Sequence, residues 1–176
     1  MVIFVNGSFG IGKTTVARLL ARRLPRGTLF DPEPIGVVLM RLSALRPFSA
    51  RVDDFQDLGL WRATSISLIH LLLRVRRRLV VPMTFSNPAY LGQFLASVSR
   101  HDRETFHFCL TASLATVRAR LADREAGRGP SAWQLRRSAE CCAAHQGPEF
   151  AEQIATEDRS PDEIADEIMR RLPANA

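Results

Sequence analysis

The feature that most constrains this chain is a glycine-rich segment near its start, GSFGIGKT at residues 7–14. It matches G-x-x-x-x-G-K-[ST] at every constrained position, with an apolar run before it and a helical pattern after it. Glycines let backbone N–H groups surround phosphate oxygens, and the dipole of the following helix attracts the same anion. The segment therefore predicts a nucleoside triphosphate site in which Lys13 contacts the β- and γ-phosphates and Thr14 binds Mg²⁺. The predicted nucleotide-binding residues are Gly7, Ser8, Phe9, Gly10, Ile11, Gly12, Lys13, Thr14 and Thr15.

The rest of the chain alternates apolar runs with amphipathic stretches, a pattern typical of a parallel α/β sheet. Strands are expected at residues 2–5, 28–30, 79–83, 105–110 and 154–156. Helices are expected at residues 13–24, 58–76, 90–98, 114–124 and 131–144, with a last helix that starts near residue 160. Residues 35–57 indicate only a short helix and a loop. Pro82 lacks a backbone donor, so we expect it at a strand end or a bulge.

Composition narrows the class of protein further. The 176 residues match one domain, which we take to span residues 1–176, and 46% apolar with 24% charged residues exclude wholesale disorder. No apolar run reaches the roughly 18 residues that a membrane span needs. Three cysteines without C-x-x-C spacing argue against a zinc site or disulfides and predict a reducing, cytoplasmic location.

The chain is basic, with a net charge of +6 and a pI near 10.4, and Lys13 is its only lysine. The high arginine content has two alternative explanations. One is codon bias, and the other is a surface for anionic partners, either phosphates or nucleic acid. The densest basic run, residues 74–78, has few aromatic neighbours to stack on bases, so we interpret it as a solvated helix end. We therefore expect no nucleic-acid partner.

Three classes of nucleotide-binding protein compete. A GTPase switch needs a guanine-reading N-K-x-D motif. That motif is absent, because the only lysine of the chain lies in the phosphate loop. A motor or remodelling ATPase usually needs a larger chain and an acid at the end of an apolar strand, whereas residues 79–83 are followed by Thr84 and Phe85. A small kinase fits best, because its size and late arginine-bearing segment match this chain.

Two carboxylates follow the second expected strand, Asp31 and Glu33. Ligands of parallel α/β sheets bind at the carboxyl ends of the strands, so this position faces the space beside the phosphate loop. A carboxylate there can accept the proton of an attacking hydroxyl or hold Mg²⁺ through water. Residues one apart in an extended chain point in opposite directions, so we expect one of the two to face the site. Asp31 is the first choice for the base and Glu33 the second.

Two arginines, Arg120 and Arg124, are four residues apart on the expected helix at 114–124 and share one face of it. A glycine-rich break at 127–130 follows. An arginine pair before such a hinge can close over the triphosphate and neutralise transition-state charge. We predict a short lid around residues 120–140 that carries these two catalytic arginines.

The acceptor pocket is less defined by pattern. Thr84 and Phe85 follow the third strand, next to the phosphate loop, while Trp61 and Arg62 begin a helix after the ambiguous region. We expect these four residues, with Asp31 or Glu33, to contact the acceptor.

The chain resembles the tunicamycin-resistance ATP-binding proteins, small P-loop proteins related to nucleoside and nucleotide kinases. The segments that carry the resemblance are residues 2–15, FDPEPIG at 30–36, VVPMT at 80–84, PAYL at 88–91, RLADR at 120–124 and FAE at 150–152. The resemblance implies a doubly wound, five-stranded parallel fold of the nucleoside-monophosphate-kinase type that uses ATP and Mg²⁺. It also implies resistance to nucleoside-type antibiotics, which similar phosphotransferases inactivate by phosphorylating a hydroxyl. No acid follows the third strand, so metal ligands beyond Thr14 stay undefined.

These observations lead to one expectation and two alternatives. We expect ATP-dependent phosphoryl transfer to a hydroxyl of a small molecule, such as the nucleoside-type antibiotic tunicamycin. The alternatives are an ATP-binding protein that sequesters the drug without modifying it, and a metabolic kinase for a sugar or shikimate-like acceptor. The sequence leaves the oligomeric state open between monomer and homodimer.

Overall fold

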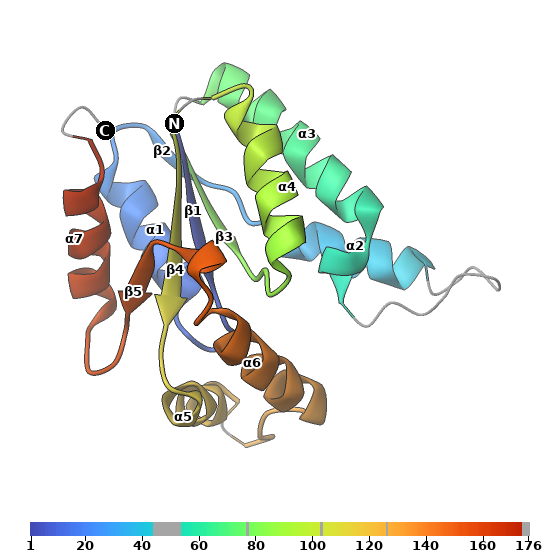
Figure 1. The fold of residues 1–176 in the computed structure, drawn as a ribbon, viewed down its shortest axis with the longest axis vertical. Helices are drawn as coiled ribbons and strands as arrows, with labels where there is room; N and C mark the ends of the chain where they lie inside the picture. The colour runs from blue at the N-terminus through green and yellow to red at the C-terminus, as the bar shows by residue number, and fades with distance from the viewer. Residues whose placement is uncertain (44–53, 77, 103, 126, 174–176) are drawn as a thin grey trace.

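The computed structural model describes residues 1–43, 54–76, 78–102, 104–125 and 127–173. It contains a five-stranded parallel sheet with helices on both faces (Figure 1). The strand order is β2-β3-β1-β4-β5. The strands are β1 (Val2–Gly7), β2 (Gly27–Leu29), β3 (Arg78–Met83), β4 (Thr105–Thr111) and β5 (Gln153–Ala155). The chain thus winds to one side of β1 and then to the other, which confirms the expected doubly wound sheet.

The helices divide between the two faces and one edge of this sheet (Figure 1). They are α1 (Lys13–Arg23), α2 (Glu33–Ser43), α3 (Gly59–Val75), α4 (Pro88–Ser99), α5 (Leu114–Arg124), α6 (Ala132–Ala144) and α7 (Pro161–Arg171), with short 3₁₀ turns η1 (Phe55–Asp57) and η2 (Pro148–Phe150). Helices α1 and α7 cover one face, and α3 and α4 cover the other. Helices α5 and α6 lie at the carboxyl edge of the sheet, where the phosphate loop also lies.

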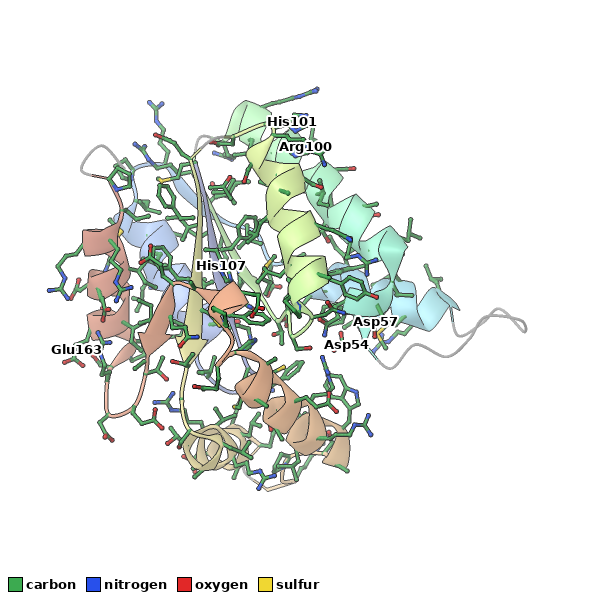
Figure 2. All side chains as sticks on the ribbon, in the orientation of Figure 1. Asp54, Asp57, Arg100, His101, His107 and Glu163 are labelled. Carbon is green, nitrogen blue, oxygen red and sulfur yellow. The ribbon has the colours of Figure 1, made fainter. Side chains whose placement is uncertain are left out.

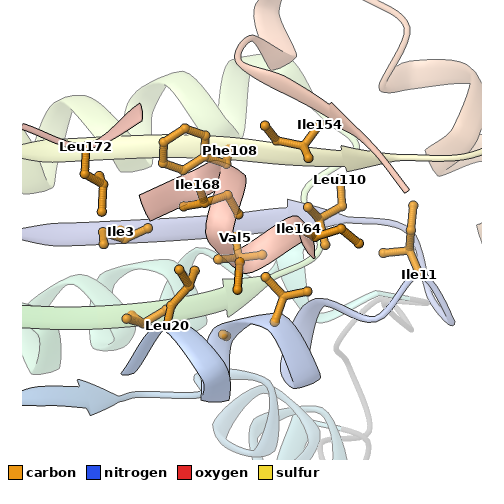
Figure 3. Close-up of a cluster of buried hydrophobic side chains, with 14 of the residues drawn as sticks. Ile3, Val5, Ile11, Leu20, Phe108, Leu110, Ile154, Ile164, Ile168 and Leu172 are labelled. Carbon is orange, nitrogen blue, oxygen red and sulfur yellow. The ribbon is translucent and has the colours of Figure 1, made fainter. Parts of the chain in front are cut away.

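The central strand explains why the core has two halves. Every residue of β1 is buried, and its side chains alternate between the two faces. Ile3 and Val5 join the cluster that contains Leu20 and Ile168 (Figure 3), whereas Phe4 belongs to the cluster on the opposite face. A strand that is apolar on both sides is stable only inside such a sandwich of helices, so β1 fixes the position of the loop that follows it.

All five expected strands and the helices between them are found, with boundaries that differ by a few residues. The ambiguous region contains more structure than expected, since α2 occupies residues 33–43 and η1 occupies residues 55–57. The remainder of that region, residues 44–53, lies outside the described residues. Within the described chain, no helix is both long and apolar enough to cross a lipid bilayer.

Pro82 is the penultimate residue of β3, close to the strand end where it was expected. The carbonyl of Val80 accepts a hydrogen bond from Phe30 N at 2.9 Å, so even-numbered residues of β3 direct their backbone groups toward β2. The missing N–H of Pro82 therefore faces the β2 side, where β2 has already ended at Leu29. The proline removes no donor from the ladder with β1, and the chain after Leu29 is free to turn away into α2.

Candidate active site

The phosphate loop joins β1 to α1 through backbone conformations that glycine permits. Gly10 and Gly12 have φ angles of 77° and 101°, values that side chains strongly disfavour. A Cβ atom on Gly10 would lie 2.7 Å from Cγ of Leu121 on α5, so the loop also packs too closely on that helix for any larger residue. Because α1 begins at Lys13, its unpaired N-terminal N–H groups point toward the space that the loop surrounds.

Lys13 is held inside this loop. Its side chain is buried, Nζ donates a hydrogen bond to the Ser8 carbonyl at 3.0 Å, and the ammonium lies 5.5 Å from the centre of the Phe9 ring. Burial lowers the pKa of Lys13, and the nearby Glu33 carboxylate opposes that shift. An incoming phosphate would offer the ammonium a full negative charge in place of a carbonyl oxygen, so the site favours an anion.

A cleft of about 480 Å³ opens beside the loop. Charged and hydroxyl groups from the loop, α1, the start of α2 and the end of α5 meet there. Its lining consists of Phe9, Gly10, Gly12, Lys13, Thr14, Thr15, Arg18, Glu33 and Arg124. The structure therefore brings together most of the predicted phosphate-binding residues, one of the two carboxylates and one of the two arginines.

The two carboxylates have different positions. Asp31 Oδ1 accepts a hydrogen bond from the backbone N–H of Glu33 at 3.0 Å, so this side chain caps the start of α2. Glu33 instead lines the cleft, and its Oε1 accepts a hydrogen bond from Thr84 Oγ1 at 3.1 Å. Of the two carboxylates, the cleft is therefore lined by Glu33, the second choice of the sequence analysis, and not by Asp31.

The two arginines of α5 also separate. Arg124 lines the cleft. Arg120 donates to Thr156 Oγ1 at 2.9 Å and to the Thr156 carbonyl at 2.7 Å, and it reaches the Ile11 carbonyl at 3.5 Å. It ties α5 to the phosphate loop and to the segment after β5 instead of lining the cleft.

Helices α5 and α6 flank the loop where a lid was expected. Ser8 Oγ donates to the Ser138 carbonyl at 3.4 Å, and the rings of Phe9 and Trp133 meet edge to face at 5.1 Å. Helix α6 thus packs directly on the phosphate loop.

The expected acceptor residues are mostly not exposed. Trp61 is fully buried, and its Nε1 donates to the Pro32 carbonyl at 2.9 Å, so it supports the start of α2 from the core. Phe85 is also fully buried, in the cluster that contains Trp61. The expectation that these two rings line the acceptor pocket is wrong, because an apolar ring this close to the sheet gains more from burial than from solvent. Arg62 lies over the Tyr90 ring at 4.0 Å and donates to the Gln56 carbonyl.

The sequence model of the AAA domain family matches residues 2–148. The chain belongs to this family. No curated protein sequence matches it.

Several solved structures have a fold similar to that of this AAA domain. The tunicamycin resistance protein of Deinococcus radiodurans has 26% identity and a TM-score of 0.76, over 98% of this chain and 96% of that one. A gluconokinase from Sinorhizobium meliloti has 17% identity and a TM-score of 0.66, over 96% and 89%. Shikimate kinase from Acinetobacter baumannii, solved with shikimate, has 15% identity and a TM-score of 0.61, over 96% and 90%. The resemblance inferred from the sequence is confirmed, and the fold is a kinase-like P-loop fold.

One set of polar residues in this AAA domain has no counterpart in the sequence motifs. We call it the Asp54–Arg137 network; it consists of Asp54, Gln56, Ser86 and Arg137. Arg137 on α6 pairs with Asp54 at 2.6 Å, and the two side chains are 12% and 6% exposed. Figure 2 labels Asp54 and its neighbour Asp57 where η1 approaches α6. No spacing rule links residues so far apart in the sequence.

Two buried polar side chains hold the segment after β3. Asn6 accepts from Phe85 N at 2.8 Å and donates to the Phe85 carbonyl at 3.2 Å. His145 Nε2 lies 2.8 Å from the same carbonyl, and burial lowers the pKa of His145 to about 4. The imidazole is therefore neutral at pH 7, and Nε2 carries the proton that it donates. These contacts fix Thr84, and through it the carboxylate of Glu33.

The residues of the cleft suit a magnesium–nucleotide complex. The described residues contain no group of three or more His, Cys, Asp or Glu side chains placed to hold a metal ion. Mg²⁺ prefers oxygen ligands and keeps several of its waters when phosphates share its coordination. The Thr14 hydroxyl, in the cleft with Lys13, can supply one such oxygen, and phosphate and water oxygens would complete the set.

Proposed function

We propose that this protein is an ATP-dependent kinase that phosphorylates a hydroxyl group of a small, nucleoside-type molecule such as the antibiotic tunicamycin, and that it acts in the cytoplasm. The observation that carries the proposal is the Glu33 carboxylate, which Thr84 orients and which lines the same cleft as Lys13 and Thr14. A carboxylate beside a phosphate site can accept the proton of an acceptor hydroxyl, which supports transfer to an alcohol. The tunicamycin resistance protein among the structural neighbours supports the acceptor class.

The proposed chemistry assigns one task to each group. When bound, Mg²⁺ neutralises phosphate oxygens and ATP supplies the phosphoryl group. Lys13 and the first N–H groups of α1 hold the β- and γ-phosphates, and Thr14 orients the metal. Glu33 accepts the proton of the acceptor hydroxyl while the hydroxyl oxygen forms a bond to the γ-phosphorus of ATP. The bond between the γ-phosphorus and the β–γ bridging oxygen breaks, which releases ADP. Arg124 neutralises charge that accumulates during the transfer.

The decisive experiment is mass spectrometry of nucleoside antibiotics, tunicamycin included, after incubation with the protein, ATP and Mg²⁺. We expect one compound to gain one phosphoryl group, with stoichiometric release of ADP. A reaction with Lys13→Ala protein is the matched blank. Tight drug binding in the presence of ATP without any mass gain would favour sequestration over catalysis.

A further inference from the structure

The exposed apolar side chains of this protein are concentrated on two neighbouring helices, α2 and α3, which contact one another. An isolated exposed leucine or valine is ordinary in a protein, whereas a concentration of them marks an interaction surface. Every large apolar side chain that is exposed in the described residues belongs to these two helices, with exposed fractions between 42% and 74%. They are Val37, Val38 and Leu42 on α2, and Leu60, Leu71 and Val75 on α3.

Helix α3 carries this surface as a stripe along its outer side. Residues 60, 63, 67, 71 and 74 follow one another at intervals of three or four, so they share one side of the helix, and all of them are exposed. Residues 63–73 contain no Asp, Glu, Lys or Arg, although these types make up 24% of the chain. The outer side of a helix that faces only water usually carries charged residues, so this stripe has the composition of a contact surface.

The two ends of the stripe carry opposite charges. Asp57 lies exposed just before α3, whereas Arg74 and Arg76 lie exposed at the end of the helix. Within the part of the chain that the structure describes, none of these three side chains forms an ion pair. The surface thus has an acidic end, an uncharged middle and a basic end.

We propose that a second copy of this chain covers the stripe, with the two α3 helices antiparallel about a two-fold axis near Ser67. A two-fold interface must be complementary to itself, and this arrangement brings Asp57 of each copy toward Arg74 and Arg76 of the other. A parallel arrangement would place like charges together at both ends. The opposite charges at the two ends therefore favour an antiparallel pair of copies.

The side chains of the stripe also fit this arrangement. Residues at equal distances on either side of the axis meet, so Leu60 of one copy packs against Val75 of the other, and Leu71 packs over Ala63. Small side chains near the axis, Ala63 and Ser67, let the two helices approach closely. Large residues at one half of the stripe thus meet small residues or the opposite end of the other copy.

The size of the stripe limits the strength of the dimer. A helix of 17 residues is about 25 Å long and about 10 Å wide with its side chains. One such face, even with α2 beside it, is at the low end of interface sizes, since each partner buries about 800 Å² in a standard complex. We therefore expect a reversible dimer with a Kd of roughly 10 µM.

Sedimentation of the full chain between about 1 µM and about 200 µM tests the dimer. The mass should rise from 19.7 kDa toward twice that value. Leu71→Glu places a charge in the apolar stripe and should raise the Kd at least about tenfold. Gln93→Glu adds the same charge to an exposed position of α4 and should leave the Kd within about twofold. A wild-type protein that stays monomeric throughout the range would overturn the proposal.

A cysteine near the axis tests the antiparallel arrangement. Two copies of Ser67→Cys should become linked by a disulfide when copper–phenanthroline in air oxidises the thiols, because only residues near a two-fold axis come within about 7 Å of their own counterparts. Gln93→Cys and the wild-type protein, which retains its three cysteines, are the controls and should stay unlinked. A dimer without this cross-link would overturn the proposed geometry.

Charge reversal at the ends provides a measurement that does not depend on the apolar residues. Asp57→Arg and Arg74→Glu should each raise the Kd about threefold at low salt, and the double variant should return toward the wild-type value. Losses that simply add in the double variant would overturn the charge pairing. Basic residues beside an apolar stripe also suit an anionic membrane. A monomer that floats with phosphatidylglycerol vesicles, and loses this binding in Leu71→Glu, would replace the second copy by a lipid surface and overturn the proposal.

Discussion

The phosphate end of the site, which the phosphate loop forms, and the Asp54–Arg137 network are built in different ways. At the phosphate end, one continuous loop supplies most of the contacts, and its conformation depends on glycines such as Gly10 and Gly12. The Asp54–Arg137 network instead draws single side chains from η1 and the residue before it, from the segment after β3, and from α6. The first arrangement is local and depends on the backbone, whereas the second exists only when distant elements pack together. Substitutions in the loop should therefore affect nucleotide chemistry, whereas substitutions in the network should affect how the elements pack.

The largest effect should come from Lys13→Ala, which breaks the phosphate end. Removing a cation aimed at developing phosphate charge should lower kcat about 10³-fold, while the melting temperature stays close to that of the wild type. Coupled ADP-release assays and circular dichroism measure both quantities. Arg22→Ala, which removes an exposed cation in the last turn of α1, should retain full activity. Turnover by Lys13→Ala within tenfold of the wild type would contradict the phosphate-loop assignment.

The next largest effect should distinguish the two carboxylates, Glu33 and Asp31. Glu33→Gln should lower kcat about 10²-fold or more, because the proposed base can no longer accept a proton. Asp31→Asn should keep most of the activity and cost up to about 1 kcal/mol of stability through a weaker cap on α2. Single-turnover rates and urea unfolding of both proteins give the comparison. If Asp31→Asn is the more damaged enzyme, the order of preference given by the sequence was right.

A third prediction concerns the buried imidazole of His145, which supports the segment after β3. The pKa of His145 is lowered to about 4 in the folded chain, against 6.5 for an ordinary histidine. The unfolded chain therefore binds more protons between these values, so this contribution is complete above pH 6.5 and is lost as the pH falls toward 4. Between pH 7 and pH 5 it should amount to about 2 kcal/mol.

Denaturant unfolding across this pH range tests the imidazole. His145→Gln keeps an N–H donor without a titrating ring, so its stability should depend less steeply on pH. His101→Gln removes an exposed imidazole in the turn after α4 (Figure 2) and should keep most of the wild-type slope. Parallel slopes for wild-type and His145→Gln protein would show that this ring does not control acid stability.

The smallest effect should come from the contact that orients the base. Thr84→Val deletes the hydroxyl that donates to Glu33 at 3.1 Å and keeps the shape of the side chain. We expect kcat to fall several-fold, about 1 kcal/mol, with little change in KM for ATP. Thr105→Val, at the opposite edge of the sheet, is the control. A change confined to KM for ATP would place Thr84 with the nucleotide instead of the base.

The sequence predicted what adjacent residues determine and missed what packing determines. The phosphate loop, the five strands and the start of α7 follow from motif, apolar runs and capping residues within a few positions of one another. The positions of Trp61 and Arg120 cannot be predicted in this way, because they depend on contacts between distant segments. Trp61 is buried next to the start of α2, and Arg120 bonds to Thr156. The pairing of Arg137 with Asp54 depends on tertiary contact in the same way. Glu33 is an intermediate case: the sequence narrowed the proposed base to two carboxylates, and only the folded chain shows that Asp31 bonds to the start of α2 while Glu33 lines the cleft.

Pro82 determines where β2 stops pairing with β3. A residue with a backbone N–H there would offer the chain beyond Leu29 one more rung of sheet. That rung would use the Phe30 carbonyl, because the Phe30 N–H already donates to Val80. Since proline has no N–H, the rung cannot form, and β2 ends before Asp31 and Glu33. One proline thus separates a strand that belongs to the sheet from a helix start that belongs to the site.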